Sequence, residues 1–188
     1  MEKLTKKPIR FIEKYDLDVY ASVKMARMEM PEHIIFYKKE HNEIINHLIA
    51  HECGHILRTF SVPEEKRLVP ITTQNTRANF MKEIDGDIKK LSSFMPLQHL
   101  YKLADLWHNG TIQQLTSYPP DIMIEKWIYN NYSELRPYQR DSIKRQRDSA
   151  VAVLSDDIKA IIPPKIYKIS NIMNYAFFSV LGKHIGSN

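Results

Sequence analysis

Three histidines recur at intervals of four residues in the segment NHLIAHECGHILR, residues 46–58, and this spacing most constrains how the chain can fold. Residues four apart lie on one face of an α-helix, so His47, His51 and His55 would line a single stripe. The apolar residues around them fall largely at helical intervals. They predict a helix from Asn42 to Phe60, with one flank in a core and the histidine face toward a cleft.

Gly54 interrupts this run of good helix formers. A glycine inside a helix costs about 1 kcal/mol relative to alanine. Its place in the predicted helix indicates that another element, or a substrate, approaches the backbone closely at this position.

Glu52 directly follows His51, which completes the pattern H-E-x-x-H with His55. In this pattern the two histidines hold a metal ion and the glutamate takes a proton from water. Two imidazoles one helical turn apart can converge on one tetrahedral zinc ion. His47 is followed by leucine, so a pair of His47 and His51 would have no such base, and we interpret His47 as a residue behind the ligands or on the surface.

The single cysteine, Cys53, limits the kind of metal site. Structural zinc sites are usually closed by four ligands and rich in cysteine, whereas catalytic sites use three and leave one position open. Cys53 would lie away from the histidine face and is expected to be a packing residue. A third ligand must therefore come from elsewhere in the chain.

A second informative segment is residues 75–96, NTRANFMKEIDGDIKKLSSFMP, where Phe80, Ile84, Ile88 and Leu91 predict another helix. Asp87 follows Glu83 by one turn on the same face. A carboxylate there could accept the second ring N–H of a ligating histidine and fix its tautomer. Asp85 points elsewhere on this helix.

The segments AHECGHILR, EIDGD and SSFMP together resemble the ImmA/IrrE family of soluble zinc metallopeptidases, which belong to the gluzincins. The resemblance covers residues 15–96. It implies that zinc is the cofactor and that a protein is the substrate, such as a helix-turn-helix transcriptional repressor. It also implies roles for five residues: zinc ligands His51, His55 and Glu83, general base Glu52, and supporting acid Asp87.

The second segment departs from the family at Gly86, where alanine is usual, and at the lysines after Asp87. These departures leave the register of the helix open. Asp85 or Asp87 therefore remains an alternative to Glu83 as the third ligand.

The expected fold class is α+β, zincin-like and mostly helical, with a small antiparallel sheet and a helical C-terminal half. Residues 1–96 are predicted to form a zincin-like metallopeptidase core, and residues 97–188 a helical extension packed on it. The pattern predicts strands in residues 18–25 and 33–39. It predicts helices in residues 10–17, 97–110, 119–132 and 165–182.

Composition bears on location and partners. One cysteine fits a reducing compartment, the first twenty residues are too charged for a signal peptide, and no apolar run of 18 residues exists. We expect a cytoplasmic protein with no membrane partner. The net charge is +5, and the basic stripe Arg136, Arg140 and Lys144 is interrupted by Asp141. A solvated face explains it better than a phosphate-binding one, so direct nucleic-acid binding is disfavoured.

Two functions fit these features. The first is a zinc-dependent endopeptidase acting on a protein or peptide, with Glu52 as the base. The alternative is a catalytically silent zincin scaffold that serves as a protein- or nucleic-acid-binding module. Holding a metal requires the histidines but not the carboxylate of Glu52, so the intact glutamate favours the enzyme.

Overall fold

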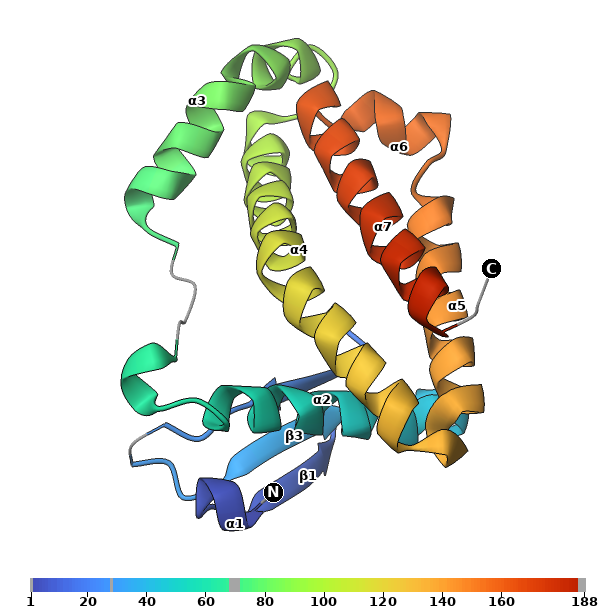
Figure 1. Ribbon diagram of the computed structural model, residues 1–188. Helices are drawn as coiled ribbons and strands as arrows, with labels where there is room; N and C mark the ends of the chain where they lie inside the picture. The colour runs from blue at the N-terminus through green and yellow to red at the C-terminus, as the bar shows by residue number, and fades with distance from the viewer. Residues whose placement is uncertain (1, 28, 68–71, 186–188) are drawn as a thin grey trace. The chain divides into compact units, whose positions relative to one another are not determined.

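The structure is a computed structural model that describes residues 2–27, 29–67 and 72–185 (Figure 1). It has an α+β fold with one three-stranded sheet, as the sequence predicts. The described residues form these elements: α1 (Glu2–Thr5), β1 (Ile9–Glu13), β2 (Ala21–Lys24), β3 (His33–Tyr37), the 3-10 helix η1 (Lys39–Ile44), α2 (Ile45–Phe60), η2 (Glu64–Lys66), α3 (Gln74–Leu91), α4 (Leu97–Asn131), η3 (Ser133–Leu135), α5 (Arg136–Ala152), α6 (Asp156–Ile161) and α7 (Pro164–Ile185).

The chain forms two compact units. The first contains residues 1–68, 120–146 and 181–188, and the second contains residues 69–119 and 147–180. Each unit therefore draws on both sides of position 96. Unit 1 holds the sheet and α2, and unit 2 is helical.

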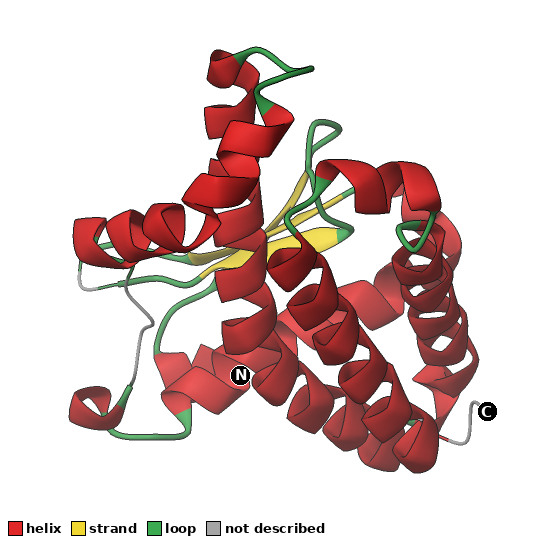
Figure 2. Ribbon diagram, turned by 90° about the horizontal axis from the view of Figure 1, so that it is seen from above, coloured by secondary structure: helices red, strands yellow, loops and turns green. Residues whose placement is uncertain are grey.

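The sheet of unit 1 has the strand order β1-β3-β2, and Figure 2 shows the three strands side by side. β1 runs parallel to β3, and β2 runs antiparallel to it. The sheet is therefore mixed, not purely antiparallel as expected. β2 is an edge strand and contacts α2, which also packs on β3. The H-E-x-x-H motif is thus carried on a helix beside an antiparallel edge strand.

The prediction of a helix in residues 10–17 is wrong, because Ile9–Glu13 form β1. All five of its residues pair with β3, from Ile9 opposite His33 to Glu13 opposite Tyr37. The alternating Ile9, Phe11 and Glu13 suit a strand as well as a helix. Pairing with a distant segment decides between the two, and local periodicity does not contain that information.

The C-terminal pattern also differs from the prediction, because residues 97–131 form one helix, α4, instead of two. Gly110 lies inside it, and a Cβ there would meet nothing within 4 Å. Pro119 and Pro120 also lie inside α4, although proline removes an N–H donor from a helix. Buried contacts on both sides, at Ala104 and Ile124, offset these local costs.

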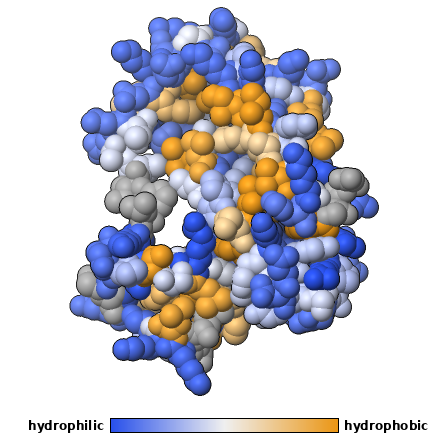
Figure 3. Space-filling model, viewed as in Figure 1, coloured by the Kyte–Doolittle hydropathy of each residue, from blue (hydrophilic) through white to orange (hydrophobic). Residues whose placement is uncertain are grey.

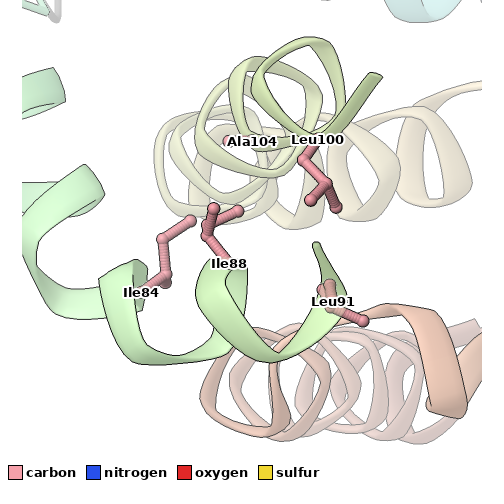
Figure 4. Close-up of a cluster of buried hydrophobic side chains, with 5 residues drawn as sticks. All are labelled: Ile84, Ile88, Leu91, Leu100 and Ala104. Atoms are coloured by element: carbon pink, nitrogen blue, oxygen red, sulfur yellow. The ribbon is translucent and has the colours of Figure 1, made fainter. Parts of the chain in front are cut away.

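The core of unit 2 confirms the predicted apolar face of α3. Three of its residues, Ile84, Ile88 and Leu91, pack with Leu100 and Ala104 of α4 (Figure 4). α3 begins with a capping box formed by the side chains and backbone N–H groups of Thr73 and Thr76. Figure 3 shows apolar side chains that remain exposed among the polar ones on the helices of this unit.

Candidate metal centre

α2 presents the three histidines as the sequence predicts, on one face of a regular helix. His47 is buried at 1% exposure, while the side chains of His51 and His55 are 17% and 22% exposed. The stripe therefore runs from the interior toward the surface. Only its outer two members are open to a ligand from solvent.

Gly54 is the point where α4 approaches α2, as its place in the helix predicts. A Cβ built on Gly54 would lie 2.5 Å from Ile124 Cγ2 and 3.2 Å from its Cγ1. Carbon atoms in contact prefer separations of about 3.5–4.0 Å, so no larger residue fits without movement. This close approach places Asp121 and Glu125, one turn apart on α4, beside the histidines.

The ligand atoms of His51, His55 and Asp121 form a small triangle. The two Nε2 atoms lie 3.1 Å apart, and Asp121 Oδ1 lies 3.2 Å from His55 Nε2 and 3.6 Å from His51 Nε2. Tetrahedral zinc with bonds of about 2.0–2.1 Å separates its ligand atoms by about 3.3 Å. Each side of the triangle therefore matches the spacing around one such ion.

Glu125 lies behind the triangle and supports two of the histidines. Its Oε1 lies 2.7 Å from His51 Nδ1, and its Oε2 lies 2.9 Å from His47 Nε2. A carboxylate only accepts hydrogen bonds, so both ring nitrogens donate. His51 thus carries a proton on Nδ1 and turns Nε2 toward the triangle. His47 is a buried partner of Glu125, so it lies behind the triangle and not on the surface.

The charges of these groups are mutually dependent. Burial would raise the pKa of Glu125, but the donors His47 and His51 outweigh it and hold that pKa well below its usual range. Burial likewise opposes ionisation of Asp121, yet His51 and His55 lower its pKa. For His51, burial would lower the pKa, but the neighbouring carboxylates of Asp121 and Glu125 raise it well above its usual range.

Glu52 lies next to the ligands along α2 and is buried at 9% exposure. Burial raises the pKa of its carboxyl group, while the positive potential of His51 and His55 partly opposes this. The Val23 backbone on β2 hydrogen-bonds to Glu52, which favours the carboxylate. The Glu52 side chain is thus attached to the edge strand of the sheet.

The residues of the triangle suit a metal ion. Asp121 Oδ1 is buried and, among the described residues, accepts no hydrogen bond of good geometry. A buried carboxylate oxygen without a donor is costly, and a cation between it and the two imidazoles would satisfy it. His51, His55 and Asp121 could therefore hold a metal ion with two nitrogen ligands and one oxygen ligand.

The structure places the predicted third ligand, Glu83, in unit 2. Its carboxylate on α3 is exposed and pairs with Lys165 Nζ at 3.0 Å, which lowers its pKa. Asp85 is also exposed and pairs with Lys89 at 2.6 Å, and Asp87 is half-buried on the same helix. The group formed within unit 1 takes its third residue from Asp121 instead. Glu83 as ligand and Asp87 as support stay predictions.

Sequence reasoning missed Asp121 and Glu125. The signal was present, because PPDIMIEKW spaces these two acids by four residues, as Glu83 and Asp87 are spaced. Spacing alone does not distinguish the two pairs. The pair on α4 lies beside the histidines because α4 packs closely against α2 at Gly54, and the identity of this partner helix is not visible in the sequence.

Comparison of the chain with protein families, with curated proteins and with solved structures finds no match. Among the described residues, no helix is both long enough and apolar enough to cross a bilayer. Any function proposed for the chain therefore rests on the residues of the candidate metal centre.

Proposed function

We propose that this chain is a zinc-dependent endopeptidase that hydrolyses a peptide bond of a protein substrate. The observation that carries the proposal is the triangle of His51, His55 and Asp121, spaced for one tetrahedral ion, beside the buried Glu52. When bound, zinc polarises a carbonyl group and acidifies water. Two histidines, one carboxylate and a free fourth position are one of the ligand sets found in catalytic zinc sites.

The residues of the protein would have three roles: to hold the ion, to orient its ligands and to transfer a proton. His51, His55 and Asp121 hold the ion, and Glu125 orients His51 through its Nδ1–H. Glu52 accepts a proton from the attacking water and returns it to the departing amine. Its raised pKa suits this exchange, because a carboxyl group that titrates closer to neutral pH both accepts and releases protons readily.

The edge strand β2 supplies a reason to favour a polypeptide substrate. Among the residues that the structure describes, β2 pairs only with β3, and its Val23 backbone hydrogen-bonds to Glu52. An extended peptide can add to the open edge of such a strand through its main chain. This would bring a scissile bond next to Glu52. A helix-turn-helix repressor as the substrate rests on the family resemblance alone, and a cytoplasmic location rests on the composition of the chain.

The identity of the third metal ligand can be tested by measuring the zinc content of variants. Purified chain is expected to hold about one zinc ion, measured by elemental analysis. Asp121→Ala should lose or weaken this binding, whereas Glu83→Ala should retain it. Zinc that is lost in Glu83→Ala but kept in Asp121→Ala would return the third ligand to α3. A folded chain that takes up no zinc when it is supplied would refute the proposed function.

Glu52→Gln separates the enzyme from a silent scaffold. The change removes the proton acceptor and keeps the size of the side chain, so zinc content should be unchanged. Hydrolysis of a casein or peptide-library substrate should fall by at least about 100-fold, the usual contribution of a general base. If a variant with normal zinc content cleaves as well as the unmodified chain, Glu52 is not the base.

A further inference from the structure

Gln139 on α5 is directed at the supporting carboxylate of the metal centre. Its side chain is fully buried at 0% exposure. Its Nε2 donates to Glu125 Oε2, and it also donates to the backbone carbonyl oxygen of Glu125 at 2.8 Å. The amide thus attaches to one residue at two points. Glu125 in turn accepts from His51, so a continuous set of hydrogen bonds links α5 to a metal ligand.

We propose that Gln139 is a positioning residue for the metal centre, acting through Glu125 on His51. The inference rests on the proposed metal site. One oxygen of Glu125, Oε2, is held by Gln139 and His47. The other, Oε1, is thereby turned toward His51 Nδ1. Without the amide, the carboxylate keeps its contacts with His47 and His51 but loses one of the donors that limit its rotation about the last side-chain bond.

A packing role alone does not account for this amide. Replacing a buried polar side chain by an apolar one of the same shape is nearly neutral only when its partners are also replaced. Here both partners are atoms of Glu125 and would remain. Among the described residues, Gln139 Oε1 is buried without a donor, so the side chain forgoes one hydrogen bond while it keeps both to Glu125. The orientation of the Gln139 amide is therefore set by its two hydrogen bonds to Glu125.

The test uses Gln139→Met in the full chain, because methionine is unbranched and of similar length but has no N–H donor. Ser142→Ala is the matched control: Ser142 is equally buried on α5 but bonds with Gln146 and not with Glu125. Zinc dissociation constants are measured by competition with a chromogenic chelator, and folding is followed by circular dichroism. Loss of a partner that orients a metal ligand weakens affinity by about 10–100-fold. Because Gln139 acts through Glu125, we expect a loss at the lower end of this range, about 10-fold, in Gln139→Met and a change of less than about 3-fold in Ser142→Ala.

A second readout does not need metal. In the zinc-free chain, the Nδ1–H proton of His51 should exchange slowly by NMR, since it is hydrogen-bonded to Glu125. In Gln139→Met it should exchange faster. If Gln139→Met does not fold, Gln139→Asn takes its place, because it keeps an amide but withdraws it by one methylene.

The outcomes are distinct. Unchanged zinc affinity together with unchanged exchange in a folded variant overturns the positioning role. An unmodified chain that binds no zinc refutes the proposed function instead, and the exchange of the His51 proton then decides the role of Gln139 by itself. A similar loss of affinity in Ser142→Ala would show that any buried change on α5 has this effect, and it would also overturn the proposal.

Discussion

Gly54→Ala tests whether the contact between α2 and α4 sets the geometry of the metal centre. The added Cβ would lie 2.5 Å from Ile124 Cγ2, about 1 Å less than the separation that carbon atoms in contact prefer. Ile124 is buried at 3% exposure, so either its side chain repacks or α4 moves, and we expect α4 to move. A shift of this size at Asp121 exceeds the tolerance of about 0.2 Å for metal–ligand distances. We therefore expect zinc affinity to fall.

The effect on stability is a difference of two terms. Alanine gains about 1 kcal/mol of helix propensity over glycine. Overpacking a core costs about 1–3 kcal/mol, so the net destabilisation should be about 0–2 kcal/mol. Gly86→Ala is the control, since a Cβ there meets nothing within 4 Å. It should gain up to about 1 kcal/mol and leave zinc binding unchanged.

Urea unfolding and chelator competition measure the two quantities. The double variant Gly54→Ala/Ile124→Ala removes the obstructing carbons. It should recover zinc affinity, although Ile124→Ala alone costs about 2–5 kcal/mol of stability. If Gly54→Ala is stabilised as much as Gly86→Ala and binds zinc equally well, the approach of α4 is not the constraint that we infer.

Two further predictions concern unit 1. Burial and the nearby Lys7 lower the pKa of His33, whose Nδ1 accepts from Ala26 N at 3.0 Å. Since its pKa in the folded chain lies below the unfolded value of about 6.5, its stabilising effect is complete above that pH and is lost as the pH falls toward the folded pKa. Urea midpoints should therefore drop more between pH 7.5 and 5.5 in the unmodified chain than in His33→Asn, and equal drops would contradict this. Burial also raises the pKa of Cys53 to about 11, so a thiol reagent at pH 8 should label it slowly in the folded chain and quickly in denaturant. Rapid labelling of the folded chain would show that its thiol is not shielded.

Local pattern was sufficient for the part of the site that lies on one helix. The spacing of His51, Glu52 and His55 depends only on the period of α2, and the strands at residues 21–24 and 33–37 follow from short apolar runs. Gly54 was also informative, because a glycine in a strong helical pattern has few reasons to be there other than close approach. These features need no knowledge of distant residues.

The carboxylate that completes the group with His51 and His55 could not be predicted from local pattern. Two pairs of acids, on α3 and on α4, have the same spacing, and the family pattern favoured Glu83. The choice of Asp121 depends on which helix packs against Gly54, which is a tertiary contact. The same limitation explains β1, where pairing with β3 overrides an amphipathic pattern. Gln139, in a segment without any motif, became visible only through its contact with Glu125.

The carboxyl groups around the histidines fall into two kinds, those with a lowered pKa and one with a raised pKa. This difference bears on which group could transfer protons. Asp121 and Glu125 have lowered pKa values, because their histidine partners outweigh burial. Glu52 has a raised pKa, because burial outweighs the attraction of the histidines. A group that stays charged can hold a cation or orient an imidazole, whereas a group with a raised pKa can exchange a proton nearer neutral pH. In the proposed enzyme, these opposite pKa shifts favour Glu52 over Asp121 as the group that transfers protons, independently of the order of residues in the motif.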